Sequence, residues 1–394
     1  MKKTTAFFVL CAVGGLAIFS STIAKNPVLP ILAQEIGATK AVIGLIAAAS
    51  TVTGILTSLP AGLLSDRRGR RPILIGSGLV FFTAPLLYFL IHVPWQLALV
   101  RVYHGLATAV FGPVAMAYVA DLAPNRRGER LGYYSSTTLA GRALAPIAGG
   151  AILTLGAWQG VYVVCAGAGL LALIGMFLLP EPPRTSEAAP TRSEQRASLR
   201  LILGDRTILV TSLAEAAQFL AFGALEAFLP LYALSVGINK AAVGLLFGVQ
   251  VGVRTLARPL MGILSDRRGR KSPILIGLGL TAIATVLFAQ TRSFAILLAL
   301  SILFGLGLSV ASAATSAFVA DLAPASGRGA ALGFMSMIMD VGQATGPALL
   351  GAILMGASYQ AGFAVIAGLV VLTCLLFALL AQEAPAAQIA NAAH

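Results

Sequence analysis

The amino-acid sequence predicts an all-α integral membrane protein with twelve transmembrane helices, arranged as two pseudo-symmetric six-helix bundles. Composition, the lengths of the apolar runs and an internal repeat support this fold class. Of the 394 residues, 58% are hydrophobic and only 10% are charged. A soluble protein carries charge at about a quarter of its positions, so a chain with so few charged residues belongs in a lipid bilayer.

Twelve apolar runs are long enough to cross a bilayer. About 20 helical residues, at a rise of 1.5 Å each, span about 30 Å of hydrocarbon. The predicted spans are residues 5–24, 41–64, 72–92, 95–120, 131–155, 158–180, 207–234, 241–264, 273–290, 294–320, 330–356 and 359–381. The first run also has the pattern of a cleaved signal peptide. Because its removal would break the symmetry of two six-helix halves, we expect it to remain as a membrane helix.

The distribution of basic residues predicts the orientation of the chain. Lys and Arg near transmembrane helices favour the cytoplasmic side. Most of them fall in loops on the side of the N-terminus, and those assigned to the other side are Lys25, Lys40, Lys240 and Arg292. We therefore expect a multi-pass protein of the cell inner (plasma) membrane with both termini in the cytoplasm. The net charge of +13 is divided among short loops, so no nucleic-acid partner is expected.

The two halves of the chain repeat each other. GLLSDRRGRR at 62–71 returns as GILSDRRGRK at 262–271, and YVADLAP at 118–124 returns as FVADLAP at 318–324. The predicted domains are an N-terminal six-helix bundle (1–180), a cytoplasmic linker (181–204) and a C-terminal six-helix bundle with a short cytoplasmic tail (205–394). Parallel repeats of six helices are typical of secondary transporters whose substrate site lies between the halves.

Both ten-residue segments resemble the loop signature of the major facilitator superfamily, found between helices 2 and 3 and between helices 8 and 9. The resemblance covers essentially the whole chain. Within the superfamily, the chain is similar to the twelve-helix drug:proton antiporter (multidrug efflux) group. The resemblance implies alternating access controlled by a conformational latch, whose residues here are Gly62, Asp66, Arg67, Gly69, Arg70, Asp121, Gly262, Asp266, Arg267, Gly269, Arg270 and Asp321.

The glycines of this latch have expected structural roles. We expect Gly62 and Gly262 to let neighbouring helices approach closely, and Gly69 and Gly269 to form tight turns that a side chain would hinder.

The charged residues of the latch have two interpretations. The resemblance implies that Asp121 and Asp321 are the acidic partners of Arg70 and Arg270. The alternative is that the arginines only keep these loops in the cytoplasm, a role that lysine would fill equally well.

A glycine-rich pattern lies in the fifth predicted helix. GYYSSTTLAGRALAPIAGG at 132–150 resembles the motif associated with antiporters of the superfamily, with Ala145 in place of one glycine. Small residues let helices pack closely, and proline lets a helix bend. A similar run in the eleventh helix means that the pattern also fits repeat packing. The predicted packing residues are Gly132, Gly141, Pro146, Gly149, Gly150, Gly346 and Pro347.

The few charged residues inside the predicted helices are candidates for substrate binding and ion coupling. Each costs roughly 2.5–3.5 kcal/mol at a helix centre, so each requires a partner or a function. The proton-coupling candidates are Asp340 and Glu215, followed by Glu226 and His104. The substrate-cavity candidates are Arg101, Arg142, Arg254, Gln218, Gln250, Gln343 and Phe222. The alternative is that the acids form static ion pairs that hold helices together.

These features predict a secondary transporter that exports small amphiphilic or anionic compounds by proton-coupled antiport. The alternative is an importer, facilitator or lipid flippase on the same fold. An enzyme is not expected, because the sequence has no G-x-x-x-x-G-K-[ST], H-E-x-x-H or G-x-S-x-G motif. We expect no metal and no cofactor. The expected partners are a small-molecule substrate, protons and the bilayer, and the expected functional state is a monomer.

Overall fold

The computed structural model describes residues 3–122, 126–182, 204–323 and 327–382. All regular secondary structure in these ranges is helical. Most of the predicted linker (residues 183–203) and the C-terminal tail from residue 383 lie outside the described residues.

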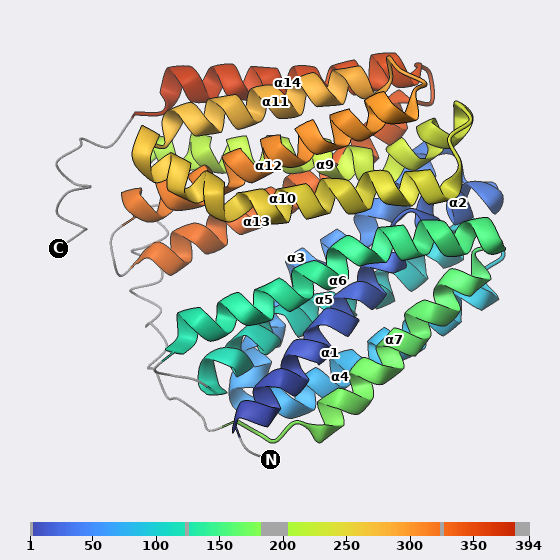
Figure 1. Ribbon diagram of the computed structural model, residues 1–394, viewed down its shortest axis with the longest axis vertical. Coiled ribbons are helices and arrows are strands. Elements are labelled where there is room, and N and C mark those ends of the chain that lie inside the picture. Colours follow the sequence, from blue (N-terminus) through green and yellow to red (C-terminus); the bar gives the residue numbers. More distant parts are fainter. Residues whose placement is uncertain (1–2, 123–125, 183–203, 324–326, 383–394) are drawn as a thin grey trace. The chain divides into compact units, whose positions relative to one another are not determined.

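Long helices account for nearly all of the described chain (Figure 1). The helices are α1 (Lys3–Ile23), α2 (Val28–Glu35), α3 (Lys40–Arg68), α4 (Arg70–Leu87), the short 3₁₀ helix η1 (Tyr88–Leu90), α5 (Pro94–Leu122), α6 (Arg127–Leu155), α7 (Gln159–Leu178), α9 (Arg206–Ser235), α10 (Lys240–Arg268), α11 (Lys271–Phe288), α12 (Phe294–Leu322), α13 (Arg328–Ile353) and α14 (Tyr359–Leu380).

Each predicted membrane span corresponds to one of the long helices. By length and composition, 11 described helices can cross a membrane. The twelfth long helix, α13, is outside this set because Asp340, Gln343 and several small residues make it less apolar. The first span is longer than predicted, since α1 and α2 together form one apolar segment, Thr4–Glu35. Lys25 therefore lies in the turn between the two helices of this segment, and its predicted place on the outer side stays a prediction.

The internal repeat is visible in the helices themselves. Helices α3 and α10 have 29 residues each, α4 and α11 have 18 each, and α5 and α12 have 29 each. Equal lengths in corresponding positions confirm that the sequence repeat is a repeat of structure.

The described chain divides into two compact units. Unit 1 contains the described residues of 1–186, 226–252 and 347–356, and unit 2 contains the rest. In unit 1, α1 packs on α6 and α7, α3 packs on α5, and α4 packs on α5 and α7 (Figure 1). Fully buried aromatic residues such as Phe81, Phe111 and Tyr118 fill its core. In unit 2, α11 packs on both α12 and α14.

Glycines of the α6 motif sit where helices of unit 1 approach closely. A Cβ atom on Gly141 would collide with the carbonyl oxygen of Gly15 in α1, and one on Gly150 would lie 2.6 Å from the carbonyl oxygen of Lys240. Gly149 faces the α1–α2 turn. A Cβ on Gly132 would meet no described atom of unit 1 within 4 Å, so Gly132 makes no close contact within this unit and its predicted packing role stays a prediction.

The second glycine run packs in the same way. In unit 2, a Cβ on Gly346 in α13 would collide with the carbonyl oxygen of Leu220 in α9. In unit 1, the carbonyl oxygen of Pro347 leaves no room for a Cβ on Gly44 of α3. The motif thus marks close helix packing in both repeats.

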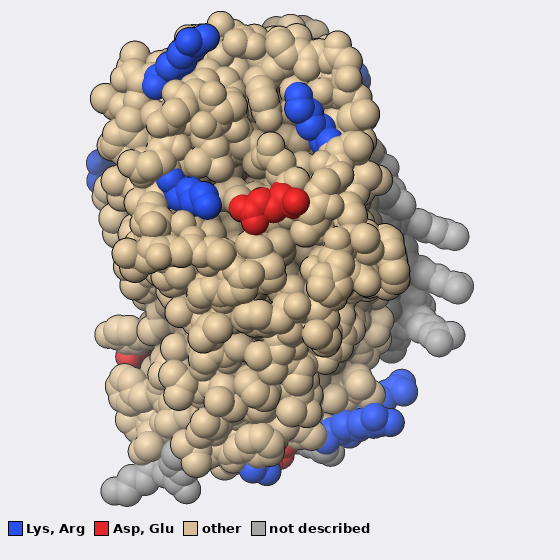
Figure 2. All heavy atoms as spheres, turned by 90° about the vertical axis from the view of Figure 1, so that its right-hand side faces the viewer, with Lys and Arg blue, Asp and Glu red and all other residues tan. Residues whose placement is uncertain are grey.

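The surface has the composition that a bilayer requires. Figure 2 looks onto the ends of the helices, where a few Lys, Arg, Asp and Glu side chains lie among other residues. Large apolar side chains are exposed on many helices, including Leu56 at 70%, Leu256 at 78% and Leu379 at 80%. A soluble protein rarely exposes so much apolar surface. The exposed apolar side chains therefore suit contact with the lipid tails of a bilayer.

Candidate functional site

A charged cluster closes the α3–α4 turn of unit 1. Arg70 Nε donates a hydrogen bond to Asp121 Oδ2 at 3.1 Å, and its Nη1 donates to Ser65 Oγ at 2.6 Å and to Asp66. The Arg70 side chain is only 18% exposed. One guanidinium therefore ties together the end of α3, the start of α4 and the end of α5.

The same cluster recurs at the α10–α11 turn of unit 2. Arg270 Nε donates to Asp321 Oδ2 at 2.9 Å, and its Nη1 donates to Ser265 Oγ at 3.0 Å and to Asp266. Burial works to lower the pKa of Arg270, but the two aspartates together outweigh it and hold the pKa above its ordinary value. Arg270 thus remains charged throughout the physiological pH range.

The latch glycines divide into two kinds. Gly69 (φ 102°) and Gly269 (φ 82°) adopt the left-handed region that favours glycine, as the tight turns require. A Cβ on Gly62 or Gly262 would meet no described atom of its own unit within 4 Å. These two glycines make no close helix contact within their units, and their expected role stays a prediction. Arg67 and Arg267 are exposed in the last turns of α3 and α10.

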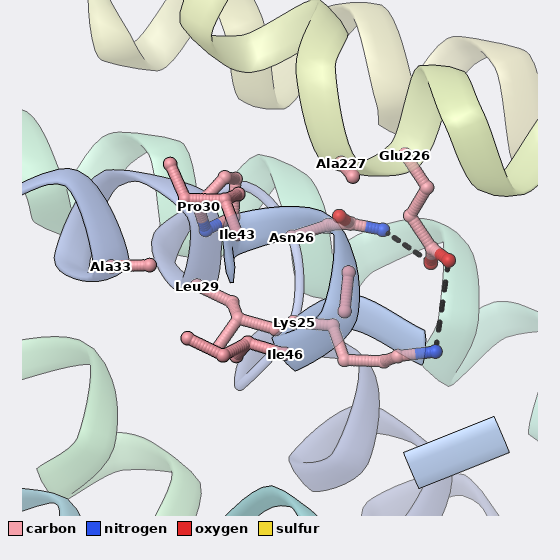
Figure 3. A pocket seen from close by; sticks show the side chains of 10 residues that line it. Lys25, Asn26, Leu29, Pro30, Ala33, Ile43, Ile46, Glu226 and Ala227 are labelled. Carbon is pink, nitrogen blue, oxygen red and sulfur yellow. Dashed lines mark hydrogen bonds and ion pairs between the residues drawn. The ribbon is translucent and has the colours of Figure 1, made fainter. Parts of the chain in front are cut away.

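A second charged cluster of unit 1 lies where α1 gives way to α2. Lys25 Nζ lies 3.6 Å from Glu226 Oε2, and Asn26 Nδ2 donates to Glu226 Oε1 at 2.8 Å. Figure 3 shows both contacts converging on Glu226 from the α1–α2 turn. The side chains of Lys25 and Glu226 are 22% and 17% exposed. The Glu226 carboxylate is therefore held by a charge and an amide, largely out of water.

A small cavity adjoins this ion pair. Its volume of about 10 Å³ leaves room for about one water molecule. Apart from the polar residues, its walls are apolar, with Leu29, Ile43 and Ile46 among the lining residues (Figure 3). Polar and apolar surfaces thus meet at Lys25.

Arg101 of α5 is buried in a neutral polar network of unit 1. It is 2% exposed, and it donates to Ser50 Oγ at 2.5 Å and to Tyr88 Oη at 3.3 Å. Tyr88 also lies 3.2 Å from His104 Nδ1 and stacks on Tyr162 with ring centroids 3.9 Å apart. Among the described residues, Arg101 Nε and His104 Nε2 have no hydrogen-bond partner.

Arg142 of α6 belongs to the same electrostatic environment. Its side chain is exposed, and no carboxylate of the described residues forms an ion pair with it. Glu226 lies within electrostatic range of Lys25, Arg101 and Arg142. Of these three described cations, Lys25 contacts Glu226 directly, and Arg101 and Arg142 act on it at longer range.

Glu215 of α9 is the buried carboxylate of unit 2. It is 3% exposed and accepts hydrogen bonds from Ser312 Oγ and Thr315 Oγ1 of α12, both at 2.7 Å. The amide nitrogen of Gln218 lies 3.5 Å from Oε2, the oxygen that Thr315 also contacts. Within the described ranges, no Lys or Arg forms an ion pair with Glu215. Neutral groups alone therefore hold this carboxylate.

Arg254 of α10 packs against two aromatic rings of α9. The guanidinium carbon of Arg254 lies 4.8 Å from the ring centroid of Phe219 and 5.8 Å from that of Phe222, within the range of cation–π contacts. Asp340 and Gln343 of α13 are half-buried.

Gln250, which belongs to unit 1, is 1% exposed. Both polar atoms of its amide lack a partner among the described residues. Such a buried amide requires a partner, so Gln250 stays a candidate for binding a polar group.

Sequence reasoning missed several members of these clusters. Ser50, Ser312 and Thr315 carry no sequence signal, since isolated hydroxyl residues are common in membrane helices. Lys25 had one usable signal, because it precedes Asn26-Pro27 and a further apolar run that extends the span. The hydroxyl contacts become visible only when helices pack.

Comparison with known proteins identifies the family. The Major Facilitator Superfamily model matches residues 10–239 and 211–393, which together span nearly the entire chain. The uncharacterized MFS-type transporter MJ1560 of Methanocaldococcus jannaschii is 24% identical over 82% of this chain and 85% of its own length. Multidrug resistance protein MdtG of Citrobacter koseri is 25% identical over 89% of this chain and 88% of its own length.

Solved structures share the fold. The inward-facing, unoccupied crystal structure of a bacterial homolog of the human lysosomal transporter Spinster matches with a TM-score of 0.80. The match covers 99% of this chain and 96% of that one, at 17% sequence identity, so it bears on the fold alone. The repeated Arg–Asp clusters, the helices and the family match lead to one conclusion: the chain belongs to the Major Facilitator Superfamily and is a multi-pass membrane transporter of small molecules, not an enzyme.

Proposed function

We propose that this transporter exports small amphiphilic or anionic compounds in exchange for protons. The proposal of proton coupling rests on the environment of Glu215. This residue is 3% exposed, and its carboxylate accepts hydrogen bonds from neutral donors alone among the described residues. No described Lys or Arg is paired with Glu215, so a proton is the counter-charge that this site can accept. Contact with water on alternate sides of the membrane would then let Glu215 take up a proton on one side and release it on the other.

Two observations support the direction of transport. The glycine pattern of α6 resembles the antiporter motif, and its Gly141 and Gly150 lie at close helix contacts of unit 1. Relatives at about the same identity include multidrug resistance proteins such as MdtG. We propose a functional monomer in the cell inner (plasma) membrane, in which bundles 1–180 and 205–394 alternate between two arrangements and the Arg70 and Arg270 clusters act as latches.

Proton flux in proteoliposomes tests this proposal. Vesicles that contain the protein and a pH-sensitive dye would be placed in a pH gradient and challenged with cationic, anionic and zwitterionic amphiphiles. We expect at least one compound to dissipate the gradient. Glu215→Gln should reduce that flux to the level of empty vesicles, because glutamine keeps the hydrogen-bonding shape but carries no titratable proton.

Glu35→Gln is the matched control, since Glu35 is an exposed carboxylate in the last turn of α2. It should leave the flux unchanged. Asp340→Asn tests the second candidate in the same assay. Solute crossing without proton movement would contradict antiport and would favour the facilitator or flippase alternative.

A further inference from the structure

The charges of unit 1 do not balance near Glu226. Lys25, Arg101 and Arg142 all lie within electrostatic range of this one carboxylate. The other described acids of unit 1 lie in or beside the terminal turns of their helices, as Asp66, Asp121 and Glu129 do. This part of unit 1 therefore has an excess of positive charge.

Arginine cannot relieve this excess by losing a proton. A guanidinium stays protonated in proteins, and a buried charge is costly unless it is paired. Arg101 is 2% exposed, yet its described partners, Ser50 and Tyr88, are neutral and its Nε has none. The site is thus incomplete without an additional negative charge.

Lys25 and Arg142 keep exposed surface that an added anion can contact. Arg142 is exposed, and Lys25 is 22% exposed. Lys25 is engaged by Glu226 at 3.6 Å, longer than the 2.7–2.9 Å of a strong charge-assisted hydrogen bond. An incoming carboxylate or similar group can therefore compete with Glu226 for Lys25.

We infer that Lys25, Arg101 and Arg142 form the binding site for the anionic head group of the transported compound, with Glu226 as the resident counter-ion that this group displaces. The inference rests on the proposed transport function and narrows its substrates to compounds with an anionic head.

Binding of a matched pair of fluorescent probes tests the site. Dansylglycine carries a carboxylate, and dansylglycinamide differs from it by a neutral amide. Each would be titrated into the full-length protein in nanodiscs, with empty nanodiscs subtracted. We expect the parent protein to bind dansylglycine more tightly than the amide by about tenfold, the factor that corresponds to 1.4 kcal/mol.

Four variants distinguish the loss of the binding site from a general folding defect. Lys25→Gln and Arg142→Gln should each remove most of the preference for dansylglycine. Glu226→Gln should strengthen dansylglycine binding, because it removes the competitor, and a folding defect cannot produce that gain. Arg258→Gln, which removes an exposed arginine of α10 in unit 2, is the charge-matched control and should change neither affinity.

Equal affinity of the parent protein for the two probes would overturn the inference, as would an unchanged preference in Lys25→Gln and Arg142→Gln. These binding measurements require no transport. A protein that exchanges protons but shows no head-group preference would overturn only the anion site. A protein with the preference but no proton flux would overturn only the proposed antiport.

Discussion

Arg70 and Arg270 each connect several helix ends through a single side chain. The planar guanidinium donates at once to a serine, to the aspartate of its own turn and to the aspartate at the end of another helix. A lysine ammonium lacks this fork geometry. The charge alone therefore does not account for arginine at these positions.

Arg70→Lys measures how much the geometry contributes. We expect it to lower the free energy of unfolding by about 1–2 kcal/mol, because hydrogen bonds to charged groups of this kind are lost. Thermal unfolding in detergent, followed by tryptophan fluorescence, should show a melting temperature lower by a few degrees.

Arg68→Lys is the control for this change, since Arg68 is exposed in the same turn. Equal melting temperatures for the two variants would support the alternative in which the arginines serve only to keep the loop in the cytoplasm.

At the scale of the elements, glycines decide how closely helices pack. Gly141 and Gly132 belong to one motif on α6, but only Gly141 meets another helix, at Gly15 of α1. We expect Gly141→Ala to destabilise the protein by about 1–3 kcal/mol, because the added methyl group must push the two helices apart.

Gly132→Ala provides the matched comparison on the same helix. It adds a methyl group in open space and raises helix propensity, so stability should stay the same or rise by up to about 1 kcal/mol. Thermal unfolding of both variants checks the pair. A similar loss in both would show that the motif acts through something other than the α1–α6 contact.

The break between α1 and α2 is a second feature at this scale. Helix α1 ends at Ile23, residues 24–27 form a turn, and α2 begins at Val28. The turn holds Lys25 and Asn26 against Glu226 of α9. A local interruption of one helix thus places a cation, Lys25, beside a carboxylate that is 201 positions away along the chain (226 − 25 = 201).

At the scale of the whole molecule, the basic loops predict both termini in the cytoplasm. Green fluorescent protein fused to the C-terminus should therefore fluoresce in a bacterial host, and alkaline phosphatase at that position should be inactive. Fusion of the phosphatase after Gly237, beyond the end of α9, should give activity. The opposite pattern would mean an inverted topology.

The sequence by itself determined the class of protein, the number of long helices, their repeat and the family. Apolar runs, basic loops and a recurring ten-residue motif are properties of the linear chain, because the bilayer and the helix period act on each segment separately. Even the pairing of Arg70 with Asp121 could be expected from the family motif, and the structure places the two in contact.

The tertiary structure decided which polar residues meet. Glu215 accepts hydrogen bonds from Ser312 and Thr315, and Glu226 pairs with Lys25. Gly141 packs against α1, whereas Gly132 contacts no other helix of its unit. Proton coupling at Glu215 or Asp340 stays a prediction. The contacts could not be read from the sequence because each joins residues far apart in the chain. Their meeting depends on the rotation and register of packed helices, and hydrophobic patterns alone do not specify these.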